Sequence, residues 1–507
     1  MTERSGDPSN DNTSGSGWRS SRWSRIFLPA CLAVYLALGI AYAVVLPLGQ
    51  APDEPAHFQY VLFIAEHGRL ADIRVDEPGY EGYQAPLYYT LCAAIGKLAM
   101  IGAPDDPVEP PEALRAPDEE ILARLPRYPT VRTGQHQLAL DALRQAEAAN
   151  VAERRAWYAV RLFTVIIGGI GVFLGYRIIF LLFPGRPWIA GTTAALMATL
   201  PMYTHICASA SNDPPTVAAV GLVLLLSLLV MREGPSVGRC ALLGLAIGIG
   251  MLTKDSANTA LPAALLAVIW SVGRRHQPEP GGTLITDLAR RVAASDWGLA
   301  LKRCAVVLGV AAIVAGWWYG RNIAFYGTPT HFPANVEMQI PWETYLGYPE
   351  AVFQVLSISL PMAFRNFWAG FAWTNIAVAP WIYWVALAVK LTAVPGQALL
   401  IGDVMRRRLD WSVFQRRGFW VLFIAKALLT LAVLWYILLI DMGGGSQGRY
   451  LFPALPAIGL LWAIGIGRVL PERTHVALPF AVGGALLIFS LYCLFGVIAP
   501  FYRAMGL

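Results

Sequence analysis

Charge is scarce in this sequence. Of its 507 residues only 14% are charged, whereas 56% are hydrophobic. Soluble domains carry nearer a quarter of charged residues, so the composition excludes a soluble globular protein and indicates a polytopic membrane protein. The net charge of +6 is spread along the chain without a basic domain, which excludes a nucleic-acid partner. We interpret the basic residues as topology signals and as contacts to anionic membrane lipids.

Several motifs of known chemistry are missing as well. The six cysteines are scattered, mostly in apolar runs, and form no CxxC pair, which argues against a disulfide framework or a cysteine metal site. The absence of HExxH argues against zinc hydrolysis. The chain also lacks a Walker motif and the DxD motif of soluble nucleotide-sugar sites.

The first 25 residues contain few apolar side chains. We expect residues 1–25 to form a disordered cytoplasmic segment. A full-length apolar run follows them without a small-residue cleavage site, which excludes a signal peptide. Residues 26–500 are expected to form one transmembrane domain.

Apolar runs long enough to cross a bilayer, or nearly so, occur about eleven times. Arginines at positions 19, 22 and 25 precede the first run, which predicts a cytoplasmic N-terminus. Basic residues then alternate between predicted inside and outside loops along the chain. The candidate spans lie near 26–47, 157–183, 187–206, 214–231, 239–254, 257–273, 303–325, 376–400, 418–440, 451–468 and 477–498.

The first predicted extracytoplasmic loop, residues 48–156, begins with the polar stretch PDEPAHF. A helix is expected after it, between Pro55 and Gly68, with Phe58, Leu62 and Ala65 on one face. This helix is too short to span, and we expect it to lie in the membrane interface. The stretch 87–103 is expected to be a second juxtamembrane helix. A solvated segment follows at 104–133, then a helix near 135–156.

Six polar clusters that are distant in sequence fall on the same predicted face of the membrane. Ionisable residues at membrane depth are costly and usually functional, so this convergence indicates a site on the extracytoplasmic face. Each cluster also has a structural explanation, such as helix capping, local ion pairing or snorkelling. The clusters contain Asp53, Glu54 and His57; Gln84 and Tyr88; Asn212 and Asp213; Lys254 and Asp255; Arg321; and Arg449 and Tyr450.

The residue types in these clusters fit group transfer from a lipid phosphate. One of the two carboxylates Asp53 and Glu54 can act as a general base while its neighbour holds a cation or orients a ligand. Glu54 with His57 could bind Mg²⁺, Mn²⁺ or Ca²⁺, although such hard cations prefer oxygen ligands. Arginine and lysine side chains on this face suit an anionic lipid headgroup.

The order of the motifs PDEPAHF, YQAPLYY, SNDPPT, YGRNIAFYGTP and GRYLFPALP resembles the GT-C superfamily of integral-membrane glycosyltransferases. Within it, the chain is similar to a group of bacterial predicted membrane proteins with PDExxHF and GRYLFP motifs. Protein O-mannosyltransferases and the aminoarabinose transferases of lipid A resemble it more distantly. The family usually has a Pro–Pro pair where this chain has Ala85–Pro86.

The resemblance implies an all-α, GT-C-like fold in the bacterial inner membrane, with an extracytoplasmic active site. It implies a sugar donor linked to polyprenyl phosphate, and a glycan, lipid or protein acceptor. Asp53 matches the family's base, which implies inversion at the anomeric carbon, with Glu54 assisting through a metal or the acceptor. The implied phosphate ligands are Lys254, Arg321 and Arg449. The implied substrate-binding residues are His57, Gln84, Tyr88, Asn212, Asp213, Asp255 and Tyr450.

Two other functions remain open. A transporter or flippase of lipid-linked glycans could use the same polar clusters without chemistry, although the sequence shows no convincing repeat and its polar residues gather at one face. A scaffold protein would leave the clustered acids and bases unexplained. Proximity of Asp53 to Arg449 and Lys254 in space would favour the transferase.

Overall fold

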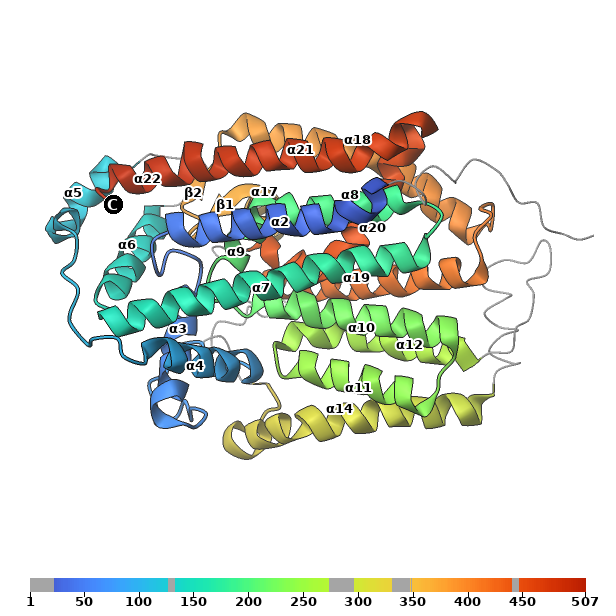
Figure 1. The fold of residues 1–507 in the computed structure, drawn as a ribbon, viewed down its shortest axis with the longest axis horizontal. Helices are drawn as coiled ribbons and strands as arrows, with labels where there is room; N and C mark the ends of the chain where they lie inside the picture. Colours follow the sequence, from blue (N-terminus) through green and yellow to red (C-terminus); the bar gives the residue numbers. More distant parts are fainter. Residues whose placement is uncertain (1–21, 126–132, 273–295, 331–346, 348, 440–445) are drawn as a thin grey trace, which may run out of the picture.

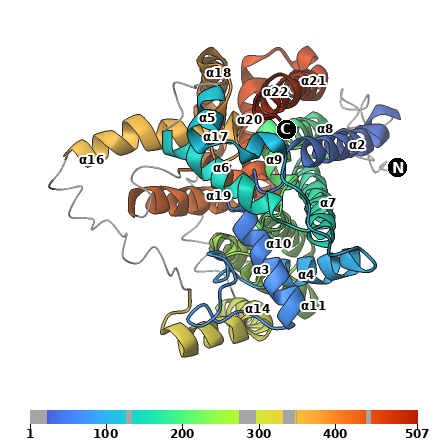
Figure 2. The same cartoon turned by 90° about the vertical axis from the view of Figure 1, so that its left-hand side faces the viewer.

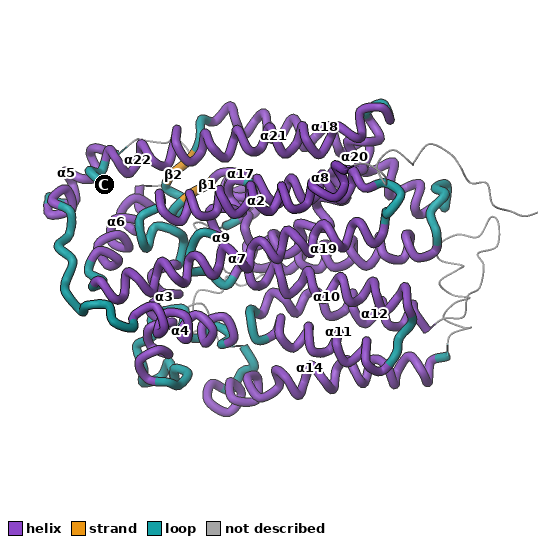
Figure 3. Tube along the Cα trace, viewed as in Figure 1, coloured by secondary structure: helices purple, strands orange, loops and turns teal. Residues whose placement is uncertain are grey.

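The computed structural model describes residues 22–125, 133–272, 296–330, 347, 349–439 and 446–507. Within these residues the chain is a bundle of long, roughly parallel helices (Figure 1, Figure 3). The described part has a single strand pair, in which β1 (Gly370–Phe371) runs antiparallel to β2 (Ile376–Ala377). The expected all-α class is confirmed. The expected disorder of residues 1–25 falls largely outside the described residues.

Eight helical segments of the described chain are long and apolar enough to cross a membrane. This confirms a multi-pass membrane protein. Two of the eight consist of consecutive helical elements, in which 3₁₀ or π-helical turns adjoin α-helices. The eight are α2 (Arg22–Val45), α7 (Val151–Leu182), α10 (Asp213–Glu233), α14 (Trp297–Tyr326), α18 (Pro380–Met405), α19 (Val413–Leu439), η4 with α20 (Gly448–Ala454 and Leu455–Val469), and η5, α21, η6 and α22 (Glu472–Ala477, Leu478–Leu491, Tyr492–Ile498 and Ala499–Ala504).

Three of the expected spans form shorter helices, so the predicted count of eleven is not confirmed. Leu200 has an extended backbone because Pro201 follows it, and this divides the run at 187–206 into two helices. The other two runs give a helix of 15 residues, and a 3₁₀ turn followed by 12 helical residues. These elements are α8 (Pro187–Thr199), α9 (Pro201–Cys207), α11 (Val237–Met251), η2 (Asp255–Ala260) and α12 (Leu261–Val272).

The segment between α2 and α7 folds as a cap on one end of the bundle (Figure 1). We call this end the α3 end. A further pair of helices, joined by a π-helical turn, precedes β1. The cap comprises α3 (Glu54–His67), α4 (Leu87–Met100), η1 (Glu112–Arg115), α5 (Asp118–Arg124) and α6 (Thr133–Glu147); the later elements are α16 (Pro349–Gln354), η3 (Val355–Ser359) and α17 (Leu360–Ala369).

Helix α3 is short, as expected, and one side of it is buried within the protein. Phe58, Tyr60 and Val61 are each no more than 1% exposed, because α3 packs against α4 and α7 in a shared apolar cluster. The Phe58 ring stacks on Trp157 of α7 at 4.2 Å between ring centres. The polar residues at the start of α3 are therefore held in place against α4 and α7.

Candidate functional site

Asp53 precedes α3 in a backbone conformation that is unusual for its residue type. Its φ of 63° is left-handed, and its side chain makes no capping hydrogen bond to the helix. The alternative that Asp53 merely caps α3 is therefore wrong. Left-handed backbone costs free energy in residues other than glycine and is concentrated at functional sites. Here the turn frees the carboxylate to face residues from other parts of the chain.

The Asp53 carboxylate lies in a row of alternating charges. Arg449, in η4, donates a hydrogen bond to Asp53, and its other terminal nitrogen lies 3.2 Å from Asp213 at the start of α10. Lys254, which precedes η2, lies 2.5 Å from the other oxygen of Asp213. Tyr80 also donates a 2.8 Å hydrogen bond to Asp53. The structure thus unites four of the six predicted polar clusters.

Within this row, exposure differs between the members. The side chain of Arg449 is only 2% exposed, whereas that of Asp53 is 25% exposed. Lys254 is 18% exposed. The ring of Tyr450 lies beneath both cations, 5.4 Å from the Arg449 guanidinium and 5.8 Å from the Lys254 amine. Asp53 and Lys254 are therefore the members that a bound molecule could reach most directly.

A second group of polar side chains lies beside Asp53. The Nδ1 atom of His57 is 2.8 Å from the Tyr89 hydroxyl. Asn212 donates to that hydroxyl and to the side-chain oxygen of Gln84, both at 3.2 Å. Glu81 lies 4.0 Å from His57. The predicted residues His57, Gln84 and Asn212 thus belong to one hydrogen-bonded group.

Two members of the site, Tyr80 and Glu81, were missed from the sequence. Both stand in GYEGYQAPLYY, only a few residues before the motif that was recognised. The available signal was an acidic residue between two glycines in a predicted extracytoplasmic loop. Acidic residues in such loops are common, and the carboxylates of PDEPAHF already supplied the acidic groups that the expected chemistry needs.

The surroundings set the charge states of these groups. Burial opposes ionisation of Asp53, but the charge of Arg449 and the hydrogen bond from Tyr80 outweigh it and hold its pKa below the usual value. Burial, and next the charge of Asp53, raise the pKa of Glu81 to about 7. Burial lowers the pKa of His57 to about 3. At neutral pH the site therefore has an ionised Asp53 beside a neutral imidazole.

Asp53, His57 and Glu81 can supply three ligand atoms that lie within 4.8 Å of one another. The Oε2 atom of Glu81 is buried and has no hydrogen-bond partner among the described residues. A buried carboxylate oxygen without a partner is costly. Two carboxylates and a neutral imidazole can hold a divalent cation.

Glu54 faces the opposite way from Asp53, into the bundle. Its carboxylate is fully buried and receives two hydrogen bonds of 2.7 Å from Arg161 of α7. Trp157 and the backbone amides of Ala210 and Gly49 donate to it as well. Because both oxygens are saturated, the predicted metal and acceptor roles of Glu54 find no support in this geometry.

Arg161 completes the anchor for Glu54. Its Nη1 atom donates to the backbone oxygens of Ala43 and Leu46, and its Nη2 atom donates to that of Pro47 as well as to Glu54, where α2 ends. An unpaired charge at this fully buried position would strongly destabilise the protein, so Glu54 and Arg161 are expected to stay paired in this arrangement. The pair therefore fixes the chain just before Asp53 to the first third of α7.

Three predicted site residues make their contacts away from the Asp53 row. Arg321 donates to the backbone oxygen of Ala71 and lies over the rings of Trp318 and Phe325. Asp255 accepts a 3.2 Å hydrogen bond from Tyr319. The Tyr88 hydroxyl is 2.8 Å from that of Thr164. Their predicted contacts with phosphate or substrate find no support here.

Comparisons with known proteins were made for the whole chain. A comparison with curated proteins gave no match. Among solved structures, the chain is similar to ArnT from Cupriavidus metallidurans in the apo state, with a TM-score of 0.42 and 16% identity. That alignment covers 90% of this chain and 61% of the ArnT chain. For ArnT bound to undecaprenyl phosphate the TM-score is 0.44 at 15% identity, with 96% and 75% of the two chains covered.

A family model matches residues 36–458, a range that includes PDEPAHF, GRYLFP and every residue of the Asp53 row. The family is described as "Predicted membrane protein (DUF2142)". The match confirms the predicted resemblance to a group of predicted membrane proteins. The chain belongs to the DUF2142 family of predicted membrane proteins.

Proposed function

We propose that this protein is an integral-membrane glycosyltransferase. In this proposal it moves a sugar from a polyprenyl-phosphate donor to a hydroxyl group of a glycan, lipid or protein acceptor. The observation that carries the proposal is the row Asp53–Arg449–Asp213–Lys254, which sets a partly exposed carboxylate beside two cations. A carboxylate base and a phosphate-binding pair are the two elements that such a transfer needs.

Asp53 is the proposed general base. Of the two adjacent carboxylates it is the exposed one, and it is ionised at neutral pH. It would accept the proton of the acceptor hydroxyl while the oxygen attacks the anomeric carbon of the donor. The bond from that carbon to the phosphate oxygen breaks on the opposite side, so the transfer inverts the anomeric centre.

Arg449 and Lys254 are the proposed phosphate ligands. Their charges are balanced by Asp53 and Asp213 in the described structure. A donor phosphate would share the two cations with these carboxylates. The developing negative charge of the departing polyprenyl phosphate would then be stabilised by preorganised cations in a buried setting. Tyr450 supports both cations from below.

A divalent cation fits beside this row, and we propose Asp53, His57 and Glu81 as its ligands. This set replaces the predicted pair of Glu54 and His57. The oxygen of Glu81 without a partner is the observation that supports it. Among Mg²⁺, Mn²⁺ and Ca²⁺, a mixed imidazole and carboxylate set suits Mn²⁺ best. When bound, such an ion would supply positive charge to the donor phosphate.

The proposed location is the bacterial inner membrane, with the α3 end on the extracytoplasmic side and the N-terminus in the cytoplasm. The alternation of basic residues in the sequence supports this orientation. Residues 273–295, which include Arg274, Arg275, Arg290 and Arg291 of a predicted inside loop, lie outside the described residues. On this orientation the sugar is transferred at the external surface.

The proposal can be tested in a strain that lacks the gene. We expect mass spectrometry of its envelope glycans to show the loss of one sugar, which returns with the wild-type gene but not with Asp53→Asn. Glu77→Gln is the matched control, because Glu77 is an exposed carboxylate in the same cap. Unchanged glycans in the deletion strain, or full restoration by Asp53→Asn, would refute the proposal. Accumulation of the lipid-linked donor on the cytoplasmic side would indicate a flippase instead.

A further inference from the structure

The hydrogen bonds of Asp53 divide its carboxylate into a buried side and an exposed side. The Oδ2 atom accepts from Arg449, whose side chain is buried. The Oδ1 atom accepts a 2.8 Å hydrogen bond from the hydroxyl of Tyr80, and Tyr80 is 55% exposed. The oxygen on the solvent side of the proposed base is therefore covered by a phenol that takes no part in the proposed transfer.

The backbone that carries Tyr80 is held in place. It belongs to the loop between α3 and α4, which lie in front of α10 and α11 when the bundle is seen from the α3 end (Figure 2). Gly79 has a φ of 79° and lies so close to α3 that a Cβ atom there would be 2.6 Å from Oε1 of Gln59. The amide of Gly82 donates to the backbone oxygen of Gly79, and Glu81 is buried. The loop is therefore fixed on both sides of Tyr80.

The side chain of Tyr80 is held less firmly than its backbone. Among the described residues its hydroxyl bonds to Asp53 alone, and no ring or cation stacks on its phenol. Exposed side chains change rotamer within picoseconds to nanoseconds. Rotation of the phenol alone is therefore enough to uncover Oδ1 of Asp53.

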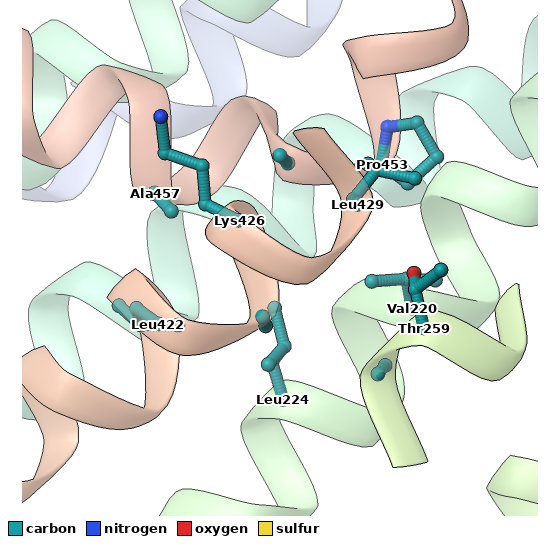
Figure 4. A pocket seen from close by; sticks show the side chains of 11 residues that line it. Val220, Leu224, Thr259, Leu422, Lys426, Leu429, Pro453 and Ala457 are labelled. Carbon is teal, nitrogen blue, oxygen red and sulfur yellow. The ribbon is translucent and has the colours of Figure 1, made fainter. Parts of the chain in front are cut away.

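The bundle interior gives no other approach to Asp53. A small cavity lies between α10, α19 and η4 (Figure 4), but its lining is mainly aliphatic and includes neither Asp53 nor Tyr80. Arg449 and Asp213, which continue the row into the bundle, are both buried. An acceptor hydroxyl therefore reaches Asp53 from the side that Tyr80 covers.

Water can make the same contact with Asp53 as an acceptor hydroxyl. Its oxygen would then bond to the anomeric carbon while Asp53 accepts one of its protons. The bond from that carbon to the phosphate oxygen breaks, and its electron pair stays on the phosphate. The products are free sugar and polyprenyl phosphate, so a base open to water would consume donor without transfer.

We propose that Tyr80 is a specificity residue that selects the acceptor over water at Asp53. Its hydroxyl occupies the place of the acceptor hydroxyl until the bound acceptor displaces the phenol. This inference rests on the proposed function. Because Tyr80 is attached to the chain beside Asp53, its high effective concentration favours it over a single water molecule. A larger acceptor makes further contacts with the protein, and these contacts offset the displacement.

The test measures free and transferred sugar by mass spectrometry. Each purified variant is added in detergent to an envelope extract of the strain without the gene, which contains unused donor and acceptor. Tyr80→Phe should still transfer sugar but should release free sugar roughly tenfold faster than the wild type, the effect of one hydrogen bond to a charged group. Tyr492→Phe, which removes the hydroxyl of another exposed tyrosine, should match the wild type. Asp53→Asn/Tyr80→Phe should release none, because water needs the same base.

Equal release of free sugar by Tyr80→Phe and the wild type, with transfer intact, would overturn the proposal. Slower transfer without added release would overturn it too, since Tyr80 would then assist Asp53 and not shield it. Neither transfer nor release by the wild type would refute the proposed function itself. The contact also has a readout without activity, because the ¹⁹F signal of 3-fluorotyrosine at position 80 should shift in Asp53→Asn. An unshifted signal would show that the two side chains do not meet.

Discussion

Arg449 donates a hydrogen bond to Asp53, although the two residues are 396 positions apart in the chain. The same guanidinium reaches Asp213 with another nitrogen. One side chain therefore joins the cap at the α3 end to two of the spanning segments.

Two replacements of Arg449 are expected to distinguish the effect of its positive charge from the effect of its contacts with two carboxylates. Lysine keeps the charge but cannot reach Asp53 and Asp213 together, so Arg449→Lys should lower the transfer rate by roughly 10- to 100-fold. Arg449→Gln leaves both carboxylates without their shared partner, which costs about 3–5 kcal/mol for a buried pair. Transfer assays and thermal unfolding in detergent measure the two effects. Wild-type activity in Arg449→Lys would show that transfer does not depend on simultaneous contact of Arg449 with Asp53 and Asp213.

Glu54 and Asp53 are adjacent but should respond differently to substitution. Glu54→Gln breaks the buried pair with Arg161 and should destabilise the protein by about 3–5 kcal/mol. The fraction that folds should retain its KM, because Glu54 does not face the site. Asp53→Asn should do the reverse, with a wild-type yield and little transfer. Glu66→Gln, an exposed change on the same helix, controls for charge removal. A normal yield with lost transfer in Glu54→Gln would show that Glu54 acts in the chemistry.

Glu81 gives the protein a predictable dependence on pH. Its pKa is about 7 in the folded protein, compared with 4.5 for an unperturbed glutamate side chain. The folded state therefore holds this proton more tightly than the unfolded state. In the presence of a chelator, the wild type should lose stability as pH rises from about 4.5 to 7. Glu81→Gln should lack this loss and have the higher Tm at pH 8. A parallel pH dependence of Tm in the two proteins would refute the shifted pKa.

Addition of Mn²⁺ should reverse the order of the two Tm values at pH 8, so that the wild type becomes more stable than Glu81→Gln. If Asp53, His57 and Glu81 hold Mn²⁺, the ion should raise the Tm of the wild type, and most strongly above pH 7, where Glu81 is ionised. Glu81→Gln and His57→Ala should show little increase. Electron paramagnetic resonance of bound Mn²⁺ provides a readout that is independent of activity. Equal binding by Glu77→Gln and Glu81→Gln would argue against the proposed ligands.

Much of the fold could be predicted from the sequence. Apolar length placed the eight spans because burial in a bilayer leaves a clear compositional signal. Its count of eleven is not confirmed where a run was divided, as at Leu200 and Pro201, since hydropathy does not register a break in the helix. The short helix α3 was expected as well, but the burial of Tyr60 and Val61 against α4 and α7 was not.

The candidate site was predicted in part. Convergence of Asp53, Asp213, Lys254 and Arg449 followed from sorting polar residues by membrane side. That procedure could not distinguish Asp53 from Glu54, because the difference depends on one left-handed residue and on Arg161, which lies on another helix. It also grouped Arg321 with the other cations, since the side of the membrane says nothing of position within that side.

The long separation of Asp53 and Arg449 has a consequence for biosynthesis. At a translation rate of about 5–20 residues per second, roughly 20 to 80 s pass between the synthesis of these two residues. During that interval the cap has its carboxylate without the arginine that balances it. The row of Asp53, Arg449, Asp213 and Lys254 is therefore completed only when one of the last spans enters the membrane, and a chain that stops before that span has the Asp53 carboxylate but not its partner.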